Sequence, residues 1–164
     1  MISSRRVMLT MLAAPPANIV SLLGLCDDSR VPSFEYAVSI EPDGLARAED
    51  GVPVAFPDSW MPEHLVLAGL VRCTLKSLRF HAARAGIAVA GGGSASGSVA
   101  QREDDGRYAL VEALCKLDVR LEPLPDDTGI LELLAKAERD CFVGASLRAS
   151  PDYEWRVNGS VVTR

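Results

Sequence analysis

Apolar and polar positions alternate first in the segment FEYAVSI, which is rich in β-forming residues and predicts a strand over 34–40. Turn residues at 42–44 and 50–51 follow this strand, and a short apolar segment, 52–56, comes after them. We therefore expect a small antiparallel meander ahead of the first helix.

The strongest helical pattern covers residues 62–85. Pro62 suits the first turn of a helix, where its missing N–H is harmless, and Gly86 is a natural stop. One face of this segment is apolar and a polar stripe lies beside it. The face holds Leu65, Val66, Gly69, Leu70, Cys73 and Ser77, and the stripe holds Arg72, Lys76 and Arg79. A helix of this length would extend about 36 Å, so we expect it to be the central helix of the fold.

The next segments predict two strands and a second helix. The glycine-rich stretch 86–100 lacks the lysine of a phosphate-binding loop and no helix follows it directly, which favours an edge strand. A turn at 102–107 leads into 113–121, where apolar and polar residues alternate as in a half-buried strand. Suitable helix caps at 126–128 begin a helix that we expect to end at about Cys141 or a little beyond.

The carboxyl-terminal segment 150–162 predicts a final strand. The order of strands, long helix, strands, helix and strand is typical of α+β proteins, in which helices pack on one face of antiparallel sheets. We expect residues 33–164 to form this domain and residues 1–32 to be an extension of unknown order.

The amino-terminal residues MISSRRVMLTMLAA carry two arginines and a short apolar run, as a twin-arginine or secretory signal would. The run ends at Pro15, and no clean cleavage site with small residues follows it. We therefore favour an extension of a cytoplasmic protein, with an exported protein as the alternative. No segment has the roughly 20 continuous apolar residues that span a bilayer, so we expect no membrane partner.

Charge and composition exclude some classes of function. The 164 residues include 22 acidic and 17 basic residues, a net charge of −5, which argues against a nucleic-acid-binding module. A chain of this length can bury a core without disulfides or a structural metal. The cysteines form no CxxC pair, so we expect no metal and no cofactor. The two histidines, His64 and His81, are expected at the surface or an interface rather than as ligands.

Four widely spaced cysteines suggest a reducing compartment and are the candidates for chemistry. Cys115 lies on the apolar side of a predicted strand, where an inert buried thiol is expected, and Cys26 lies in the unpatterned extension. Cys73 lies on the core-facing side of the long helix beside the basic stripe. A reactive cysteine needs a nearby positive charge to lower its pKa. The pattern alone leaves Cys73 open between a core residue and a nucleophile, and Cys141 is unremarkable by itself.

Two cysteine-containing segments share their spacing with a known family. The matching positions are Pro62, Glu63, Leu65, Ala68 and Cys73 in the long helix, and Ala137, Glu138, Cys141, Val143 and Leu147 near the second. These positions, and the order of elements between them, resemble the OsmC/Ohr family of thiol-dependent hydroperoxide reductases over roughly residues 34–164.

The resemblance implies an OsmC-like α+β fold and an intertwined homodimer with sites at the subunit interface. It implies that Cys73 is the peroxidatic thiol, which an organic hydroperoxide converts to a sulfenic acid, and that Cys141 condenses with it to a disulfide. The implied reductant is a dithiol or lipoyl-type molecule. In this family an arginine from the amino-terminal sheet stabilises the thiolate and is held by the helix glutamate, which is Glu63 here.

The chain departs from the family at that arginine. The loop after the first strand carries Glu41-Pro42-Asp43-Gly44, and Arg47 follows several residues late. A carboxylate in that place would raise the pKa of the thiol rather than lower it. Either Arg47 or Arg72 substitutes, or peroxidase activity is weak or absent. The candidate catalytic residues are Cys73, Cys141, Glu63 and Arg47, and the alternative is a non-catalytic OsmC-like dimer that binds a small apolar ligand or a partner protein.

The spacing of Glu63 and Cys73 adds a constraint. Ten residues correspond to about 15 Å along a straight helix, so these two side chains cannot touch within one helix. If they share a site, a partner chain or an intervening cation must connect them.

Overall fold

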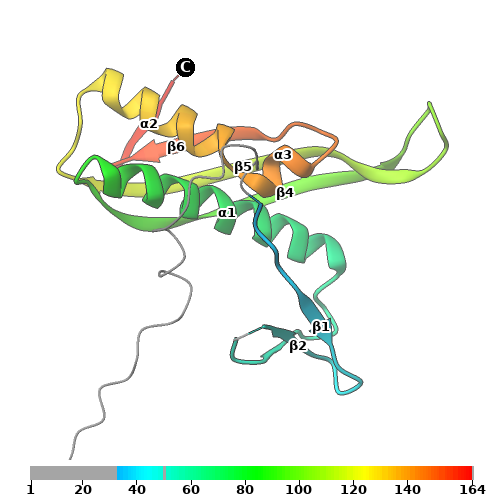
Figure 1. Ribbon diagram of the computed structural model, residues 1–164. Helices are drawn as coiled ribbons and strands as arrows, with labels where there is room; N and C mark the ends of the chain where they lie inside the picture. Colours follow the sequence, from blue (N-terminus) through cyan, green and yellow to red (C-terminus); the bar gives the residue numbers. More distant parts are fainter. Residues whose placement is uncertain (1–32, 50, 164) are drawn as a thin grey trace, which may run out of the picture.

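A computed structural model describes residues 33–49 and 51–163, which form two sheets and three helices (Figure 1). The predicted extension 1–32, with Cys26, lies outside the described residues. The elements in chain order are β1 (Val38–Ile40), β2 (Leu45–Ala48), β3 (Val54–Ala55), α1 (Pro62–Arg84), β4 (Ala88–Gln101), β5 (Tyr108–Glu122), α2 (Asp127–Arg139), α3 (Phe142–Ser146), β6 (Asp152–Val157) and β7 (Ser160–Val162).

The larger sheet has the strand order β4-β5-β6-β7. We expect antiparallel sheets from the sequence, and this expectation is wrong for one pair, because β5 and β6 are parallel. A parallel pair needs a long crossover, and the chain makes it through α2 and α3. The predicted final strand is a hairpin of β6 and β7, whose turn at Asn158 and Gly159 has positive φ at both residues.

The predicted long helix is confirmed as α1, which begins at Pro62 and ends at Arg84. At its start the backbone N–H of Met61 donates a hydrogen bond to Nδ1 of His64 over 3.0 Å. At its end Gly86 takes a φ of +71°, a left-handed conformation that glycine adopts without strain. The chain then reverses directly into β4.

The glycine-rich stretch is the predicted edge strand, β4, which pairs with β5 along its length. A Cβ atom on Gly91 would lie 2.3 Å from the carbonyl oxygen of Asp118, and one on Gly93 would lie 2.4 Å from that of Lys116. Glycine is therefore required for the close approach of the two strands at these positions. The stretch is structural in this fold.

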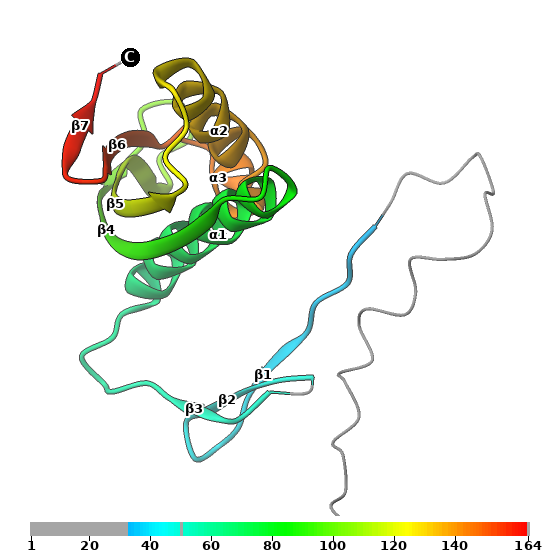
Figure 2. The same cartoon turned by 90° about the vertical axis from the view of Figure 1, so that its left-hand side faces the viewer.

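The hydrophobic core lies between this sheet and the helices, with α1 and α2 on one face (Figures 1 and 2). The predicted alternation along β5 is confirmed. Cys115, Leu117, Val119 and Leu121 are buried under the helices, and Lys116, Asp118 and Arg120 are exposed on the opposite face. The helix α2 contributes Leu133, Leu134 and Ala137 to the same core.

The predicted meander is confirmed as a second sheet with the order β1-β2-β3, although its strands are shorter than expected. We call the described residues up to 55 the amino-terminal arm. Its strands make their main contacts with one another, and the sheet that they form stands apart from the helices in both views (Figures 1 and 2). The segment before β1 contacts the rest of the fold through Phe34, whose ring stacks on that of Phe142. Its apolar side chains Phe34, Tyr36, Val38 and Ile40 are between 66% and 80% exposed.

Among the described residues, none of the helices combines the length and apolar character needed to cross a membrane.

The core position of α2 yields a stability prediction. Leu134 is fully buried, whereas Leu131 on the same helix is 39% exposed. Leu134→Ala leaves a cavity and should lower the free energy of unfolding by about 2–5 kcal/mol. Leu131→Ala, the matched control, should lower it by less than about 1 kcal/mol. Urea unfolding followed by circular dichroism measures both, and equal effects would contradict the assignment of this helix face to the core.

Candidate functional site

The two candidate thiols come together where the middle of α1 meets the start of α3. Cys73 lies on α1, and Cys141 is the residue that precedes α3. We expect from the sequence that the second helix runs to about Cys141 or a little beyond, but α2 ends at Arg139 and the short helix α3 follows after a turn. Cys141 therefore caps a new helix, and its sulfur faces α1.

The turn before Cys141 is held by charged groups. The carboxylate of Asp140 accepts hydrogen bonds from Nε and Nη2 of Arg139 over 2.7 and 2.9 Å. Its Oδ2 also lies 2.8 Å from Nε2 of His81 on α1, whose side chain is 15% exposed. Arg139 first, and His81 after it, lower the pKa of Asp140 to about 2. Asp140 is thus a charged anchor that ties the turn to α1.

The sulfur of Cys141 is fully buried and lies among polar groups. Oγ1 of Thr74 lies 3.3 Å from it, and the backbone N–H of Gly144 donates to it over 3.3 Å. The hydroxyl of Tyr153 lies close by, and the Cys141 thiol contributes to the raised pKa of Tyr153, for which burial is the main cause. Cys141 is therefore oriented by its neighbours as well as buried.

Cys73 is half-buried beside Cys141. Burial is the main cause that raises the pKa of the Cys73 thiol, and the neighbouring Cys141 thiol raises it further. The backbone amides of Val143 and Phe142 at the start of α3 act in the opposite direction. No guanidinium is among the main causes that act on the pKa of this thiol.

A cavity of about 680 Å³ opens beside Cys73. Aromatic side chains contribute much of its lining, and Phe34 of the arm stacks on Phe142 with ring centroids 6.0 Å apart. Charged and polar groups complete the lining, which consists of Phe34, Tyr36, Gly69, Arg72, Cys73, Lys76, Ser77, Phe80, His81, Asp140, Phe142 and Val143. The thiol thus faces a mainly apolar cavity of a size that suits a small organic molecule.

The structure does not bring the other two candidate residues to Cys73 within one chain. Glu63 lies in the first turn of α1, and its side chain is exposed. Arg47 lies on β2 of the arm, where its Nε is 4.0 Å from Oε1 of Glu41. Neither residue lines the cavity beside Cys73, whereas Arg72 does.

Cys115 is buried, as the alternation along β5 predicts. Burial raises the pKa of its thiol to about 12. At neutral pH this thiol is protonated and unreactive. Cys115 therefore lies behind the site as a core residue.

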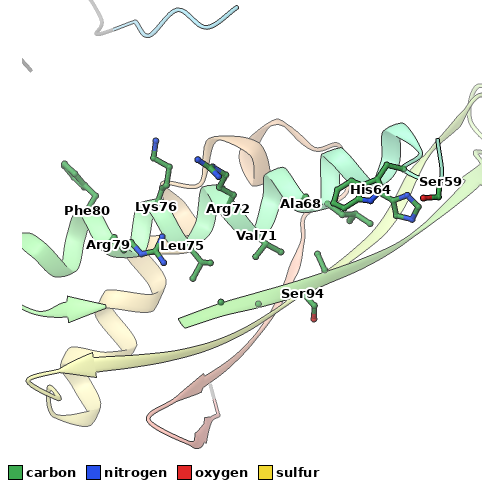
Figure 3. Close-up of a pocket in the computed structure, with 15 residues that line it drawn as sticks. Ser59, His64, Ala68, Val71, Arg72, Leu75, Lys76, Arg79, Phe80 and Ser94 are labelled. Carbon is green, nitrogen blue, oxygen red and sulfur yellow. The ribbon is translucent and has the colours of Figure 1, made fainter. Parts of the chain in front are cut away.

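A second and larger hollow, of about 1370 Å³, lies on another flank of α1, between the helix and β4 (Figure 3). Val71 and Leu75 point from α1 toward β4, while Arg72 and Lys76 point away from it (Figure 3). The hollow does not include Cys73. It is an open groove along the central helix, and it shares Arg72, Lys76 and Phe80 with the lining of the cavity beside Cys73.

Sequence reasoning did not identify four residues that shape the site, namely Thr74, His81, Asp140 and Tyr153. They come from α1, the turn before α3 and β6, and only the tertiary fold brings them together. The sequence offers one clue to Thr74, because this polar residue directly follows the candidate nucleophile on the apolar face of the helix.

Over 33–49 and 51–163, no group of three or more His, Cys, Asp or Glu residues could hold a metal ion.

Comparison with known proteins identifies the fold. The sequence model of the family described as OsmC-like protein matches residues 56–156. The structure is similar to an OsmC-like protein of Mycoplasma pneumoniae, with 16% identity and a TM-score of 0.59 over 77% of this chain and 97% of that chain. It is also similar to an OsmC-like protein of unknown function from Vibrio cholerae, with 14% identity and a TM-score of 0.61 over 76% and 100%.

A third similar structure is an organic hydroperoxide resistance protein of Elizabethkingia anophelis, with 20% identity and a TM-score of 0.51 over 77% and 96% of the two chains. No curated protein matches the sequence.

The positions of the thiols yield a prediction about oxidation. A mild oxidant should join Cys73 to Cys141 within one chain, because their sulfurs are neighbours, and Cys115 should remain a free thiol. Mass spectrometry of peptides from the oxidised, unreduced protein measures the pairing. Cys115→Ala is the control and should leave the crosslink intact. A crosslink between two chains, or one that includes Cys115, would contradict the assignment.

Proposed function

The chain belongs to the OsmC-like protein family, and from this premise we propose that it is a thiol-dependent peroxidase that reduces organic hydroperoxides in oxidative-stress defence. The observation that carries the proposal is the meeting of Cys73 and Cys141 beside a largely apolar cavity. A peroxidase of this kind needs one thiol that substrate reaches and a second that it does not. Cys73 is half-buried and lines the cavity, and Cys141 is fully buried behind it.

The proposed reaction has three steps. The Cys73 thiolate attacks the distal oxygen of the hydroperoxide, the O–O bond breaks, and the alcohol leaves with a proton while Cys73 becomes a sulfenic acid. The Cys141 sulfur then attacks the Cys73 sulfur, and the S–O bond breaks with release of water. A dithiol or lipoyl-type reductant restores both thiols by two thiol–disulfide exchanges and becomes a disulfide itself.

We propose an organic rather than an inorganic peroxide because of the cavity beside Cys73. Phe80 of α1 and Phe142 of α3 line it, and such surfaces favour an apolar substituent on the peroxide. The proposed location of this activity is the cytoplasm.

We further propose that the protein is a homodimer in which each arm packs on the other chain. Alternate residues of the arm expose Phe34, Tyr36, Val38 and Ile40 as one apolar stripe. A stripe of this kind, along an edge strand and the segment before it, is unfavourable in water and marks a contact surface. The open groove along α1 offers apolar surface on the main body of a second copy.

The proposed dimer also suggests which cation stabilises the Cys73 thiolate. Arg47 lies on the arm and is remote from the thiol cavity of its own chain. If the arm packs on a second copy, Arg47 moves to that copy and can approach its Cys73. The guanidinium would there oppose the effect of burial on the pKa of the thiol. Glu63 would hold this arginine across the same interface.

A second candidate function is a non-catalytic OsmC-like dimer that binds a small apolar ligand or a partner protein. Two observations favour it. Burial raises the pKa of Cys73, and Arg72, which lines the same cavity, is not among the main causes that act on that pKa. The apolar cavity would then serve binding alone.

Peroxide consumption separates the two functions. With an organic hydroperoxide and a dithiol, the wild-type protein should turn over. Cys73→Ser should lose at least about a hundredfold in rate, because covalent catalysis needs the nucleophile. Cys141→Ser should complete one turnover and retain a sulfenic acid on Cys73, which a trapping reagent detects by mass spectrometry.

Cys115→Ala is the matched control and should keep wild-type activity, since this thiol lies outside the cavity. Full activity in Cys73→Ser would refute the peroxidase. No turnover by the wild-type protein, together with saturable binding of a small apolar fluorescent probe, would support the binding function.

A mixing experiment tests the arginine and the dimer together. Arg47→Ala should be nearly inactive, and so should Cys73→Ser. After both variants are unfolded together and refolded, mixed dimers should recover activity, because a Cys73→Ser chain supplies Arg47 to the Cys73 of its partner. Steady-state assays measure the recovery, and light scattering measures the mass.

Refolding each variant alone provides the control and should recover nothing. If Arg47 acts within its own chain, the mixture will also remain inactive. A monomeric mass for the wild-type protein would contradict the arm exchange directly.

A further inference from the structure

We propose that Thr74 and Tyr153 are a hydroxyl pair that directs the sulfur of Cys141 during disulfide formation. The inference rests on the proposed function, because it concerns the second step of that reaction. It adds two participating side chains at the resolving thiol, whereas the residues discussed so far act at Cys73.

Thr74 is buried in an otherwise apolar core. Among the described residues, Thr74 is the only polar or charged residue that is classed as buried, and none of its surface is exposed. Burying a hydroxyl is costly unless it is hydrogen-bonded. Its Oγ1 lies 2.9 Å from the carbonyl oxygen of Leu70 and 3.3 Å from the sulfur of Cys141.

A hydroxyl has one proton, so Thr74 can donate to only one of these two partners at a time. While Cys141 is a thiol, Thr74 donates to the Leu70 carbonyl and its oxygen accepts from the S–H group. When Cys141 loses its proton, the O–H of Thr74 turns to the sulfur. The Leu70 carbonyl loses little, because the α-helix already gives it the backbone N–H of Thr74.

Tyr153 reaches the same sulfur from the sheet. A Cβ atom on Gly144 would lie 2.8 Å from the Tyr153 hydroxyl and 3.4 Å from the Cys141 sulfur, so both groups lie against this glycine. Both Thr74 and Cys141 influence the pKa of Tyr153 through their side chains. The backbone N–H of Gly144 is a further donor to the sulfur. Donors from α1, α3 and β6 therefore surround Cys141.

This arrangement matters in the resolving step. Cys141 is out of contact with solvent, so water cannot stabilise negative charge that develops on its sulfur. As the S–S bond forms, the Cys141 proton leaves with the hydroxyl group of the sulfenic acid as water. Thr74 and Tyr153 stabilise the sulfur during this transfer and keep a lone pair aimed at Cys73.

The test isolates attack by Cys141 and uses no peroxide. In a stopped-flow instrument the full-length protein is mixed with one equivalent of dithiobis(nitrobenzoate), which converts Cys73 to its mixed disulfide and releases a first thionitrobenzoate. Cys141 then attacks the Cys73 sulfur, the mixed S–S bond breaks, and coloured thionitrobenzoate leaves as an anion. Stopped-flow absorbance follows the release, and Cys141→Ser gives the background rate.

We expect Thr74→Val to slow this release about tenfold, because one hydrogen bond to a charged group is lost. Thr74→Ser should restore the rate to within about twofold, since serine keeps the hydroxyl. Tyr153→Phe should slow the release in the same direction. Ser146→Ala removes a hydroxyl from the exposed side of α3 and should change nothing. The rate of labelling at Cys73 should be unchanged throughout.

Wild-type release in Thr74→Val, or release in Thr74→Ser as slow as in Thr74→Val, would overturn the proposal. If Thr74→Val does not fold, as circular dichroism will show, Tyr153→Phe decides the matter, and an unchanged rate there refutes it. Organic-peroxide consumption is measured on the same samples. Absent consumption with slowed release in the variants would refute the peroxidase and support the hydroxyl pair.

Discussion

The contact on which the site depends is the packing of the start of α3 against the middle of α1. Gly144 makes this contact possible, because a side chain there would collide with the Tyr153 hydroxyl. The absence of that side chain lets the Cys141 sulfur reach within 3.3 Å of Thr74. The anchor between Asp140 and His81 fixes the same turn from its other side. The two thiols become neighbours because these local constraints agree.

The parts of the fold that local pattern determines were predictable from the sequence. The helix α1 has a proline at its start, a glycine at its end and one apolar face, and the strand β5 alternates clearly, so both were identified. The parallel pairing of β5 with β6 was not, because a crossover depends on contacts between distant segments. The five-residue helix α3 was also missed, since it is too short to show a period.

The candidate site divides in the same way. Family spacing singled out Cys73 and Cys141, and the structure places these thiols together. The same spacing said nothing of Thr74 or Tyr153, whose importance lies in where α3 and β6 bring the Cys141 sulfur. For Arg47 the sequence leaves its target open, because its neighbours in one chain, Ser39 and Glu41, belong to the arm itself.

Association with a second chain would remove two unfavourable features of the single chain. The arm exposes a stripe of apolar side chains, and burial and the neighbouring Cys141 thiol raise the pKa of the Cys73 thiol. A second chain that receives the arm would bury the stripe, and on our proposal the same arm would deliver Arg47 to the thiol. Apolar burial would then provide the free energy that desolvating a guanidinium requires. Assembly and thiol activation would be one event, and a free monomer would carry an intact pair of thiols without a reactive one.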